Sequence, residues 1–308
     1  MNHLTIILSF IGSVAILLFG LDTLSSSLQQ LNKEKIAGFL LKFSKTPSRG
    51  ILTGGLATII VGSSSVVIII LIVFVDSGLI KFTNAIGIVL GANIGTTIST
   101  QVIAFNIGKY AAIGLVIGVL GRMIFKNHPS KIYFQIISGI FLVFYSLHLM
   151  EVSVEPYRNW QGLIDWMKNL QNPFYGALIG SLITSIIQSS SATVAIAMIL
   201  ASEGILGLEG GIAVMLGAEI GTCFDTLIAA IGRNKEAVKL SFFHLTFNII
   251  TVILGLILFE YLYHLTIYLS DDLASNERMI ANAHMIFNCL GVLIYMVGFL
   301  IYKKLKSI

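Results

Sequence analysis

The sequence predicts an all-α polytopic membrane protein made of two inverted repeats, each with a re-entrant helical hairpin and broken helices. Three observations support this fold class. Of the 308 residues, 56% are hydrophobic and only 11% are charged, whereas soluble domains carry about 25% charged residues. Many windows of about 20 residues carry no charge, and that length of helix crosses the hydrocarbon layer. A segment of the first half also recurs in the second half.

Composition narrows the class of protein further. The net charge of +4 comes from basic residues at the ends of predicted spans, where they report orientation rather than nucleic-acid binding. The strand-like alternation over about ten residues that marks a barrel is absent. Cys223 and Cys289 lie in apolar segments, so we expect free thiols that pack as small hydrophobes.

Seven segments are predicted to cross the membrane. The first, residues 4–24, lacks a basic n-region and a small-residue cleavage site, so we expect a retained span rather than a signal peptide. The other spans are 84–106, 108–125, 131–150, 210–231, 240–265 and 279–302. Residues 1–308 are predicted to be a single transmembrane transport domain, with repeat 1 at about 4–125, repeat 2 at about 131–265 and a final helix at about 279–302.

Two equivalent segments contain most of the unusual small and polar residues. The run "IIVGSSSVVIII" at 59–70 recurs 126 residues later as "SIIQSSSATVAI", with Gln188 in place of Gly62. Downstream, "LGANIGTT" at 90–97 recurs as "LGAEIGTC". Between residues 50 and 100, 19 of 51 positions are identical to their counterparts. The matches are rich in Gly, Ser and Thr rather than Leu and Ile, so we infer an internal duplication.

Each serine segment is predicted to form a re-entrant hairpin. About 13 residues of helix precede the first serines, and at about 1.5 Å per residue they reach only the middle of the bilayer. At that depth, non-helical backbone is tolerated only inside protein or beside a water-filled cavity. A binding site is the usual reason for such a cavity.

Loop charges favour inverted repeats. The linker at 33–49 carries a net charge of +4, whereas its counterpart at 151–168 carries −1. Because cytoplasmic loops collect Lys and Arg, equivalent loops are expected to face opposite sides. If both serine segments are hairpins, 15 of the 19 Lys and Arg residues lie on one side and the N-terminus is outside. If both segments cross the membrane fully, the repeats are parallel and 14 of these residues lie on one side. The linker charges and the serines therefore decide between these topologies.

The serine triplets indicate a site for an anion and a cation. Half-helices that begin at the midplane present free N–H groups and the positive end of the helix dipole, as in many secondary transporters. Serine hydroxyls donate to oxyanions and accept toward small cations. The alternative is that the serines are small residues that let helices pack closely. The candidate ligands at the tips are Ser63, Ser64, Ser65, Gln188, Ser189, Ser190 and Ser191.

The Gly-rich segments 91–96 and 217–222 are predicted to be breaks in spanning helices, with oxygens that suit a hard cation. Glu219 replaces Asn93 and Asp225 replaces Ser99 in the second copy. A carboxylate at this depth costs about 2.5–3.5 kcal/mol and usually has a function, although Asp225 could lie in solvent at the end of its span. These segments add Asn93, Thr96, Thr97, Glu219 and Thr222 to the candidate ligands.

A shorter pattern, His-x-x-Phe-Asn, occurs at 244–248 and again at 284–288. Histidine and asparagine at positions i and i+4 share one helix face. We expect them to form hydrogen bonds between helices and to support the scaffold rather than to contact the ligand.

With both motifs present in both halves, nearly the whole chain resembles the type II sodium-dependent phosphate cotransporter family in its short bacterial form. Residues 188–191 match the family's "QSSS" hairpin tip, residues 63–65 match its serines, and "GANIGTT" from Gly91 matches its companion motif. The resemblance implies a multi-pass transporter of a bacterial cell membrane that couples inorganic phosphate to sodium. It implies no enzyme activity, no catalytic residue and no cofactor besides sodium as the coupling ion. The sodium ligands are then Ser64, Ser65, Asn93, Ser190, Ser191 and Glu219.

Two positions depart from the family pattern. Gly62 stands where the family has glutamine, and Glu219 stands where it has asparagine. Longer bacterial relatives also carry a soluble domain that resembles a phosphate-signalling regulator, so we expect such regulation to be absent or supplied by a separate chain. The predicted partners are phosphate, sodium and the lipid bilayer, and a homodimer is left open.

A dianion needs compensating charge in the membrane, because desolvating even one charge costs several kcal/mol, and no basic residue lies at the predicted midplane. Cations that travel with the anion are expected to supply that charge. Three alternatives remain: another small anion with proton coupling through Glu219, export instead of uptake, and an intramembrane serine hydrolase with His244 or His284 as the base. The duplication argues against the hydrolase, which needs only one nucleophile.

Overall fold

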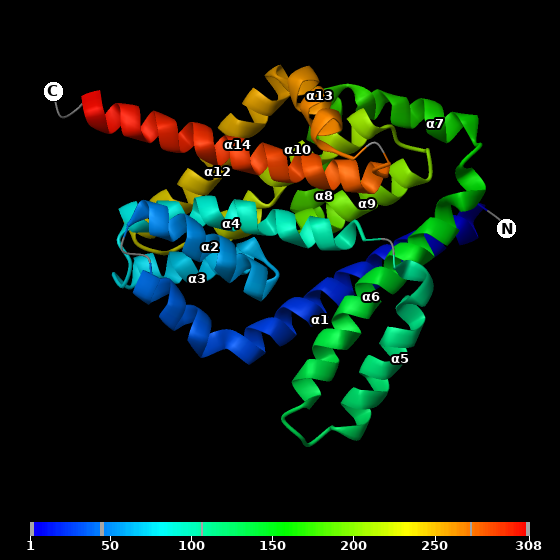
Figure 1. Ribbon diagram of the computed structural model, residues 1–308, viewed down its shortest axis with the longest axis horizontal. Coiled ribbons are helices and arrows are strands. Elements are labelled where there is room, and N and C mark those ends of the chain that lie inside the picture. The colour runs from blue at the N-terminus through cyan, green and yellow to red at the C-terminus, as the bar shows by residue number, and fades with distance from the viewer. Residues whose placement is uncertain (1–2, 44–45, 106, 272, 306–308) are drawn as a thin grey trace.

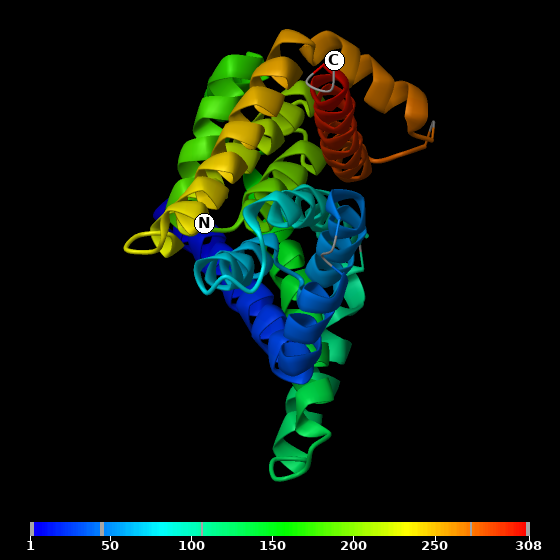
Figure 2. The ribbon, with the colours of Figure 1, turned by 90° about the vertical axis from the view of Figure 1, so that its left-hand side faces the viewer.

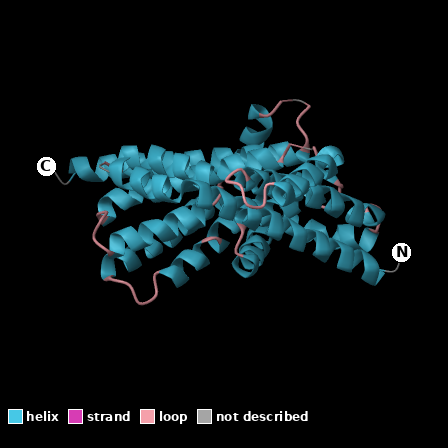
Figure 3. Cartoon of the chain, turned by 90° about the horizontal axis from the view of Figure 1, so that it is seen from below, coloured by secondary structure: helices cyan, strands magenta, loops and turns pink. Residues whose placement is uncertain are grey.

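The computed structural model describes residues 3–43, 46–105, 107–271 and 273–305, and the regular elements within these ranges are helices (Figure 1, Figure 3). Six of the helices are long and apolar enough to cross a membrane, so the chain is a multi-pass membrane protein, as predicted. The elements are α1 (His3–Phe43), α2 (Pro47–Val61), α3 (Ser64–Asp76), α4 (Phe82–Ile103), α5 (Gly108–Ile124), α6 (Lys131–Val154), η1 (Glu155–Tyr157), α7 (Gln161–Lys168), η2 (Asn169–Gln171), α8 (Pro173–Ile187), α9 (Ser190–Ser202), α10 (Leu208–Gly221), α11 (Cys223–Ala229), α12 (Lys235–Ile257), α13 (Phe259–Leu269) and α14 (Asn276–Leu305).

Two pairs of short helices form the hairpins predicted from the serine segments. Gly62 follows α2 and Gln188 follows α8, and both residues have a left-handed backbone, with φ of 72° and 53°. Each hairpin starts with a proline at the first helical position, preceded by a capping side chain, Thr46 or Asn172. The left-handed residue ends the first helix of each hairpin and turns the chain into the second.

Both ends of each hairpin lie on the same side of the protein. Helix α4 runs parallel to α2, because Gly87 lies against the backbone of Pro47 and Gly91 lies against that of Ile51. Helix α3 returns along this path, and only a short turn separates its end from the start of α4. In the second repeat, Gly217 of α10 packs in the same way on Ala177 of α8. The hairpins are therefore re-entrant.

Contacts between the halves show that the repeats run in opposite directions. At one end, the backbone N–H of Asn234, just after α11, donates to the carboxylate of Asp76 at the end of α3, at 2.8 Å. At the other end, Arg278 of α14 donates to Gln101 near the end of α4, at 3.0 Å, and the first residue of α14 donates to the carbonyl of Ala201 in α9. Thus α4 starts where α11 ends and finishes near the start of α10, which confirms the inversion (Figure 1).

The helix breaks predicted in the Gly-rich segments are only partly present. Helix α4 is continuous from Phe82 to Ile103. A Cβ on Gly91 would lie 1.9 Å from the carbonyl oxygen of Ile51, so this glycine allows a close approach of two helices rather than a break. The equivalent helix does divide, at Thr222, between α10 and α11.

Three predicted spans need correction. Helix α1 continues to Phe43, well beyond residue 24, because its polar second half packs against a hairpin tip instead of leaving the protein. The span predicted at 240–265 is divided at Leu258, where the chain turns so that α13 can pack on α14. Helix α5 has 17 residues and is not one of the six long spans. The last residue of the span predicted at 84–106 lies outside the described residues.

Helix α1 packs along α6, and α5 and α6 form a pair that extends away from the other helices (Figure 1, Figure 2). The most buried segments are α4 and α10, where Leu90 and Leu216 are completely enclosed. The two re-entrant hairpins lie against these central helices. This arrangement brings their tips toward the interior of the protein.

Candidate functional site

The two hairpin tips and α1 line one open cavity of about 360 Å³. Its walls come from α1, from α4 and from both tips, which are separated by more than 120 residues of sequence. The lining residues are Leu18, Leu21, Asp22, Ser25, Gln29, Gly62, Ser63, Ser64, Ser65, Val66, Thr96, Ser99, Ile187, Gln188, Ser189, Ser190 and Ser191. All seven tip residues predicted as ligands therefore meet at one place.

The first serine of each triplet caps the helix that follows it. The Ser63 hydroxyl accepts a hydrogen bond from the backbone N–H of Val66 at 3.4 Å, and Ser189 accepts from Ala192 at 3.2 Å. Both serines have an extended backbone, as N-cap residues do. Capping orients the tip and leaves the remaining N–H groups of the first helical turn directed at the cavity.

The second serine of each triplet is the first residue of its helix. Ser64 and Ser190 are buried, with 6% and 7% exposure, and both line the cavity. Within the part of the chain that the structure describes, neither hydroxyl hydrogen-bonds to another residue. Two donors at two helix N-termini thus face one space, where the helix dipoles favour negative charge.

The third serine of the first triplet connects the tip to a carboxylate. Ser65 lies near the carboxylate of Asp225 in α11, which places this acidic side chain beside the first tip. Ser99, the counterpart of Asp225 in the first repeat, lines the cavity. Ser191 lines the cavity as well. Asp225 itself is partly buried and does not line the cavity.

Sequence reasoning missed the contribution of α1. Asp22, Ser25 and Gln29 all line the cavity, and their spacing of three and four residues places them on one helix face. The Ser25 hydroxyl donates to the carbonyl of Val61 at 3.3 Å, which attaches α1 to the first tip. The polar spacing is visible in the sequence, but ending the span at residue 24 hid it.

Of the predicted ligands in the Gly-rich segments, Thr96 lines the cavity and the others do not. Thr97 and Thr222 donate to the carbonyls of Ile94 and Ala218, one turn earlier in their own helices, at 2.7 and 2.9 Å. Asn93 and Glu219 are buried, with 4% and 6% exposure, and face α12 and α14. These four residues form polar contacts within the scaffold behind the cavity.

The first His-x-x-Phe-Asn pattern joins α12 to both repeats. His244 Nδ1 lies 3.0 Å from the hydroxyl of Thr226 in the second repeat. One turn later, Asn248 accepts from the side-chain amide of Asn93 in the first repeat, at 2.7 Å. The same asparagine donates to the carbonyl of Glu219 at 2.9 Å.

The second pattern repeats this arrangement on α14 with the halves exchanged. His284 Nδ1 lies 2.9 Å from the hydroxyl of Thr100 in the first repeat, and Asn288 donates to Glu219 in the second, at 3.3 Å. His284 Nε2 also lies 2.5 Å from Glu219 Oε1, an acid–base pair that is almost entirely buried. The predicted hydrogen bonds between helices are therefore present, since each histidine contacts a threonine of another helix.

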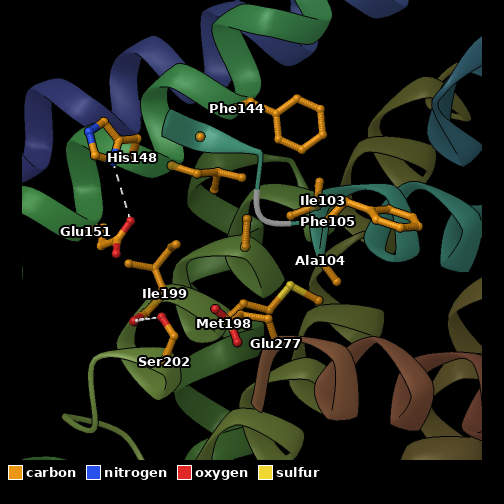
Figure 4. Close-up of a pocket in the computed structure, with 13 residues that line it drawn as sticks. Ile103, Ala104, Phe105, Phe144, His148, Glu151, Met198, Ile199, Ser202 and Glu277 are labelled. Atoms are coloured by element: carbon orange, nitrogen blue, oxygen red, sulfur yellow. Dashed lines mark hydrogen bonds and ion pairs between the residues drawn. The ribbon is translucent and has the colours of Figure 1, made fainter. Parts of the chain in front are cut away.

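A second, smaller cavity of about 30 Å³ lies between the end of α4, α6 and α9 (Figure 4). Its polar groups include His148 and Glu151, whose side chains are 3.5 Å apart and pair with each other. The Ser202 hydroxyl donates to the carbonyl of Ile199 in its own helix. Neither hairpin tip reaches this space, so the larger cavity is the candidate site.

A family model described as Na+/Pi-cotransporter matches the chain twice, over residues 16–152 and 161–297. These two matches fit the two-repeat arrangement. "Uncharacterized protein YqeW" of Bacillus subtilis (strain 168) is 29% identical over 292 residues, which cover 94% of this chain and 94% of that protein.

Relatives with a printed activity are more distant or shorter in overlap. "Putative inorganic phosphate export protein YjbB" of Salmonella typhimurium is 21% identical over 283 residues, 92% of this chain and 52% of that protein. "Sodium-dependent phosphate transport protein 2A" of Rattus norvegicus is 36% identical over 97 residues, 30% of this chain and 15% of that protein. The chain therefore spans about half of the export protein. No solved structure matches the chain.

Proposed function

Because the chain belongs to the Na+/Pi-cotransporter family, we propose that it is a secondary active transporter that couples the movement of inorganic phosphate to sodium. The observation that carries this proposal is the cavity in which both serine triplets meet, between hairpins that enter from opposite directions. We place the transporter in the cell membrane of a bacterium, in keeping with its bacterial relatives.

The charges around the cavity support coupling to a cation. Among the described residues that line it, none is Lys or Arg, and Asp22 is the one charged side chain. A phosphate dianion in this space therefore meets hydroxyls and helix N-termini, but no fixed positive charge. Because desolvating an unpaired ion costs several kcal/mol, accompanying cations lower the cost of binding. A positive charge that moves inward also gains about 2.3 kcal/mol per 100 mV of membrane potential.

Each part of the site has a proposed role. Ser64 and Ser190, with the N–H groups that follow them, bind the phosphate oxygens, and Gln188 and Thr96 complete this shell. Ser65 and Ser191 supply oxygens to sodium, together with the carbonyls of the tips. Asn93 and Glu219 are hydrogen-bonded to α12 and α14, and they can bind an ion only after those bonds break. We therefore assign them to a later state of the transport cycle.

A second candidate coupling ion is the proton, and the buried pair of Glu219 and His284 favours it. Asparagine stands at the equivalent position of the first repeat, so the acid is specific to the second. A proton bound by this pair compensates part of the negative charge of the phosphate, and this mechanism needs no sodium ligands. Export rather than uptake is the direction in the printed name of one relative.

The experiment is uptake of radiolabelled phosphate into proteoliposomes that contain the purified protein. We expect uptake to require an inward sodium gradient and to disappear in Ser64→Ala and Ser190→Ala. Ser202→Ala is the matched control, because it removes a hydroxyl from the opposite end of the same helix as Ser190. Normal uptake in both tip variants would remove the serines from the mechanism.

Changing the ion gradient across the vesicle membrane distinguishes sodium coupling from proton coupling, and changing the side that holds phosphate distinguishes uptake from export. Replacing sodium with potassium should abolish uptake, whereas dependence on a pH gradient alone would favour proton coupling. Preloaded vesicles report phosphate release, and competing oxyanions report the selectivity for phosphate. A wild-type protein that moves no phosphate under any gradient would refute the proposal.

A further inference from the structure

We propose that Gln29 of α1 supplies to the first repeat the ligand-binding side-chain amide that Gly62 lacks. The inference rests on the proposed function, because it assigns a residue to the same phosphate site. It starts from an asymmetry between two hairpin tips that otherwise have the same backbone.

The second tip carries an amide at a position where a side chain is unfavourable. Gln188 has a left-handed backbone with φ of 53°, the one residue other than glycine with positive φ among those described. L-residues avoid this conformation because Cβ approaches the following carbonyl. Within the described part of the chain, the Gln188 amide makes no hydrogen bond to protein, and it lines the cavity. Its amide is thus available to a ligand in the cavity.

The first tip has the same backbone and no side chain. Gly62 lies at φ of 72°, and its N–H bonds to the carbonyl of Thr58 as the Gln188 N–H bonds to Thr184. A Cβ on Gly62 would meet one neighbour within 4 Å, the Leu28 side chain of α1 at 3.5 Å. A side chain at this position would therefore project toward α1.

Helix α1 presents an amide at this place. Gln29, the residue after Leu28, lines the cavity. Its Nε2 donates to the Ser25 hydroxyl at 3.0 Å, and that hydroxyl donates to the carbonyl of Val61 at 3.3 Å. Val61 immediately precedes Gly62, so two successive hydrogen bonds fix Gln29 to the first tip.

Within the described part of the chain, the carbonyl oxygen and the second N–H of the Gln29 side chain make no hydrogen bond. The Gln188 amide of the other tip offers a carbonyl oxygen and N–H groups of the same kind. The site then has one amide from each side, although only one hairpin carries it in its own sequence.

The test measures the concentration dependence of phosphate uptake in proteoliposomes. Gln29→Met removes the amide but keeps the length and most of the packing of the side chain. We expect KM for phosphate to rise about tenfold or more, as for the loss of one hydrogen bond to a charged ligand, while Vmax changes little. Gln30→Ala is the matched control, because Gln30 is exposed and lies outside the cavity, and its KM should stay at the wild-type value.

Rescue distinguishes ligand binding from a structural role. Adding Gly62→Gln to Gln29→Met restores the amide at the tip, and KM should return toward the wild-type value. Size-exclusion profiles and melting temperatures in detergent establish that each variant is folded. A wild-type KM in Gln29→Met, or a folded double variant without rescue, would overturn the inference. Absence of phosphate uptake by the wild-type protein would instead refute the proposed function.

Discussion

Gln188→Gly should make the protein more stable while it weakens phosphate transport. The left-handed backbone costs an L-residue about 1–2 kcal/mol, and Gln188 adopts it with φ of 53°. Glycine removes this strain, but it adds about 0.4–1 kcal/mol of backbone entropy to the cost of folding. The net gain is about 0.5–1 kcal/mol, which for a chain of this size raises the melting temperature by roughly 1–3 °C.

The assay pairs thermal unfolding in detergent with phosphate uptake in proteoliposomes. Gly62→Gln is the reciprocal control, since it introduces the same strain at the equivalent position and should lower the melting temperature by a similar amount. The nearest atom to its Cβ is 3.5 Å away, an ordinary contact, so steric overlap adds nothing. A Gln188→Gly protein that is less stable than wild type and still transports phosphate would show that this glutamine serves the fold.

Two further predictions concern buried polar groups. Among the described residues, the buried Thr58 hydroxyl has no hydrogen-bond partner, whereas its counterpart Thr184 donates to Thr193 at 2.7 Å. We therefore expect Thr58→Val to raise the free energy of unfolding by about 1 kcal/mol and Thr184→Val to lower it by about the same amount. Equal shifts in melting temperature would contradict this difference. Glu219→Gln keeps a hydrogen-bonding group beside His284 but removes the ionisable one, so we expect folded protein whose phosphate uptake has an altered dependence on sodium or pH, and unchanged profiles for both would leave Glu219 a structural residue.

Much of the architecture follows from local sequence. Apolar length predicts the spanning helices, and the 126-residue repeat of Gly, Ser and Thr predicts two equivalent hairpins. The turn at each tip follows from the residues present, because glycine enters the left-handed region easily and the first serine caps the next helix. Loop charge predicted the inversion. Contacts of Asn234 with the end of α3, and of α14 with the ends of α4 and α9, confirm it.

The glycines of α4 and α10 show where local reading was insufficient. In the sequence, a Gly-rich segment inside an apolar run indicates either a break or a close contact, and both interpretations use the same residues. The carbonyl of Ile51, 1.9 Å from a Cβ on Gly91, decides for contact in α4. The partner helix that makes this difference lies some 40 residues away in sequence, so no local pattern records it.

By itself, the sequence determined that this is a membrane protein with two serine tips, because hydropathy, helix capping and turn formation act over a few neighbouring residues. Only the tertiary structure decided which polar groups share the cavity. It placed Asp22, Ser25 and Gln29 of α1 in the wall, and it turned Asn93 and Glu219 toward α12 and α14. The physical reason is that a buried polar side chain forms a hydrogen bond with whichever partner packing brings within reach. Packing between distant helices depends on the whole fold, so the sequence of a single helix does not predict it.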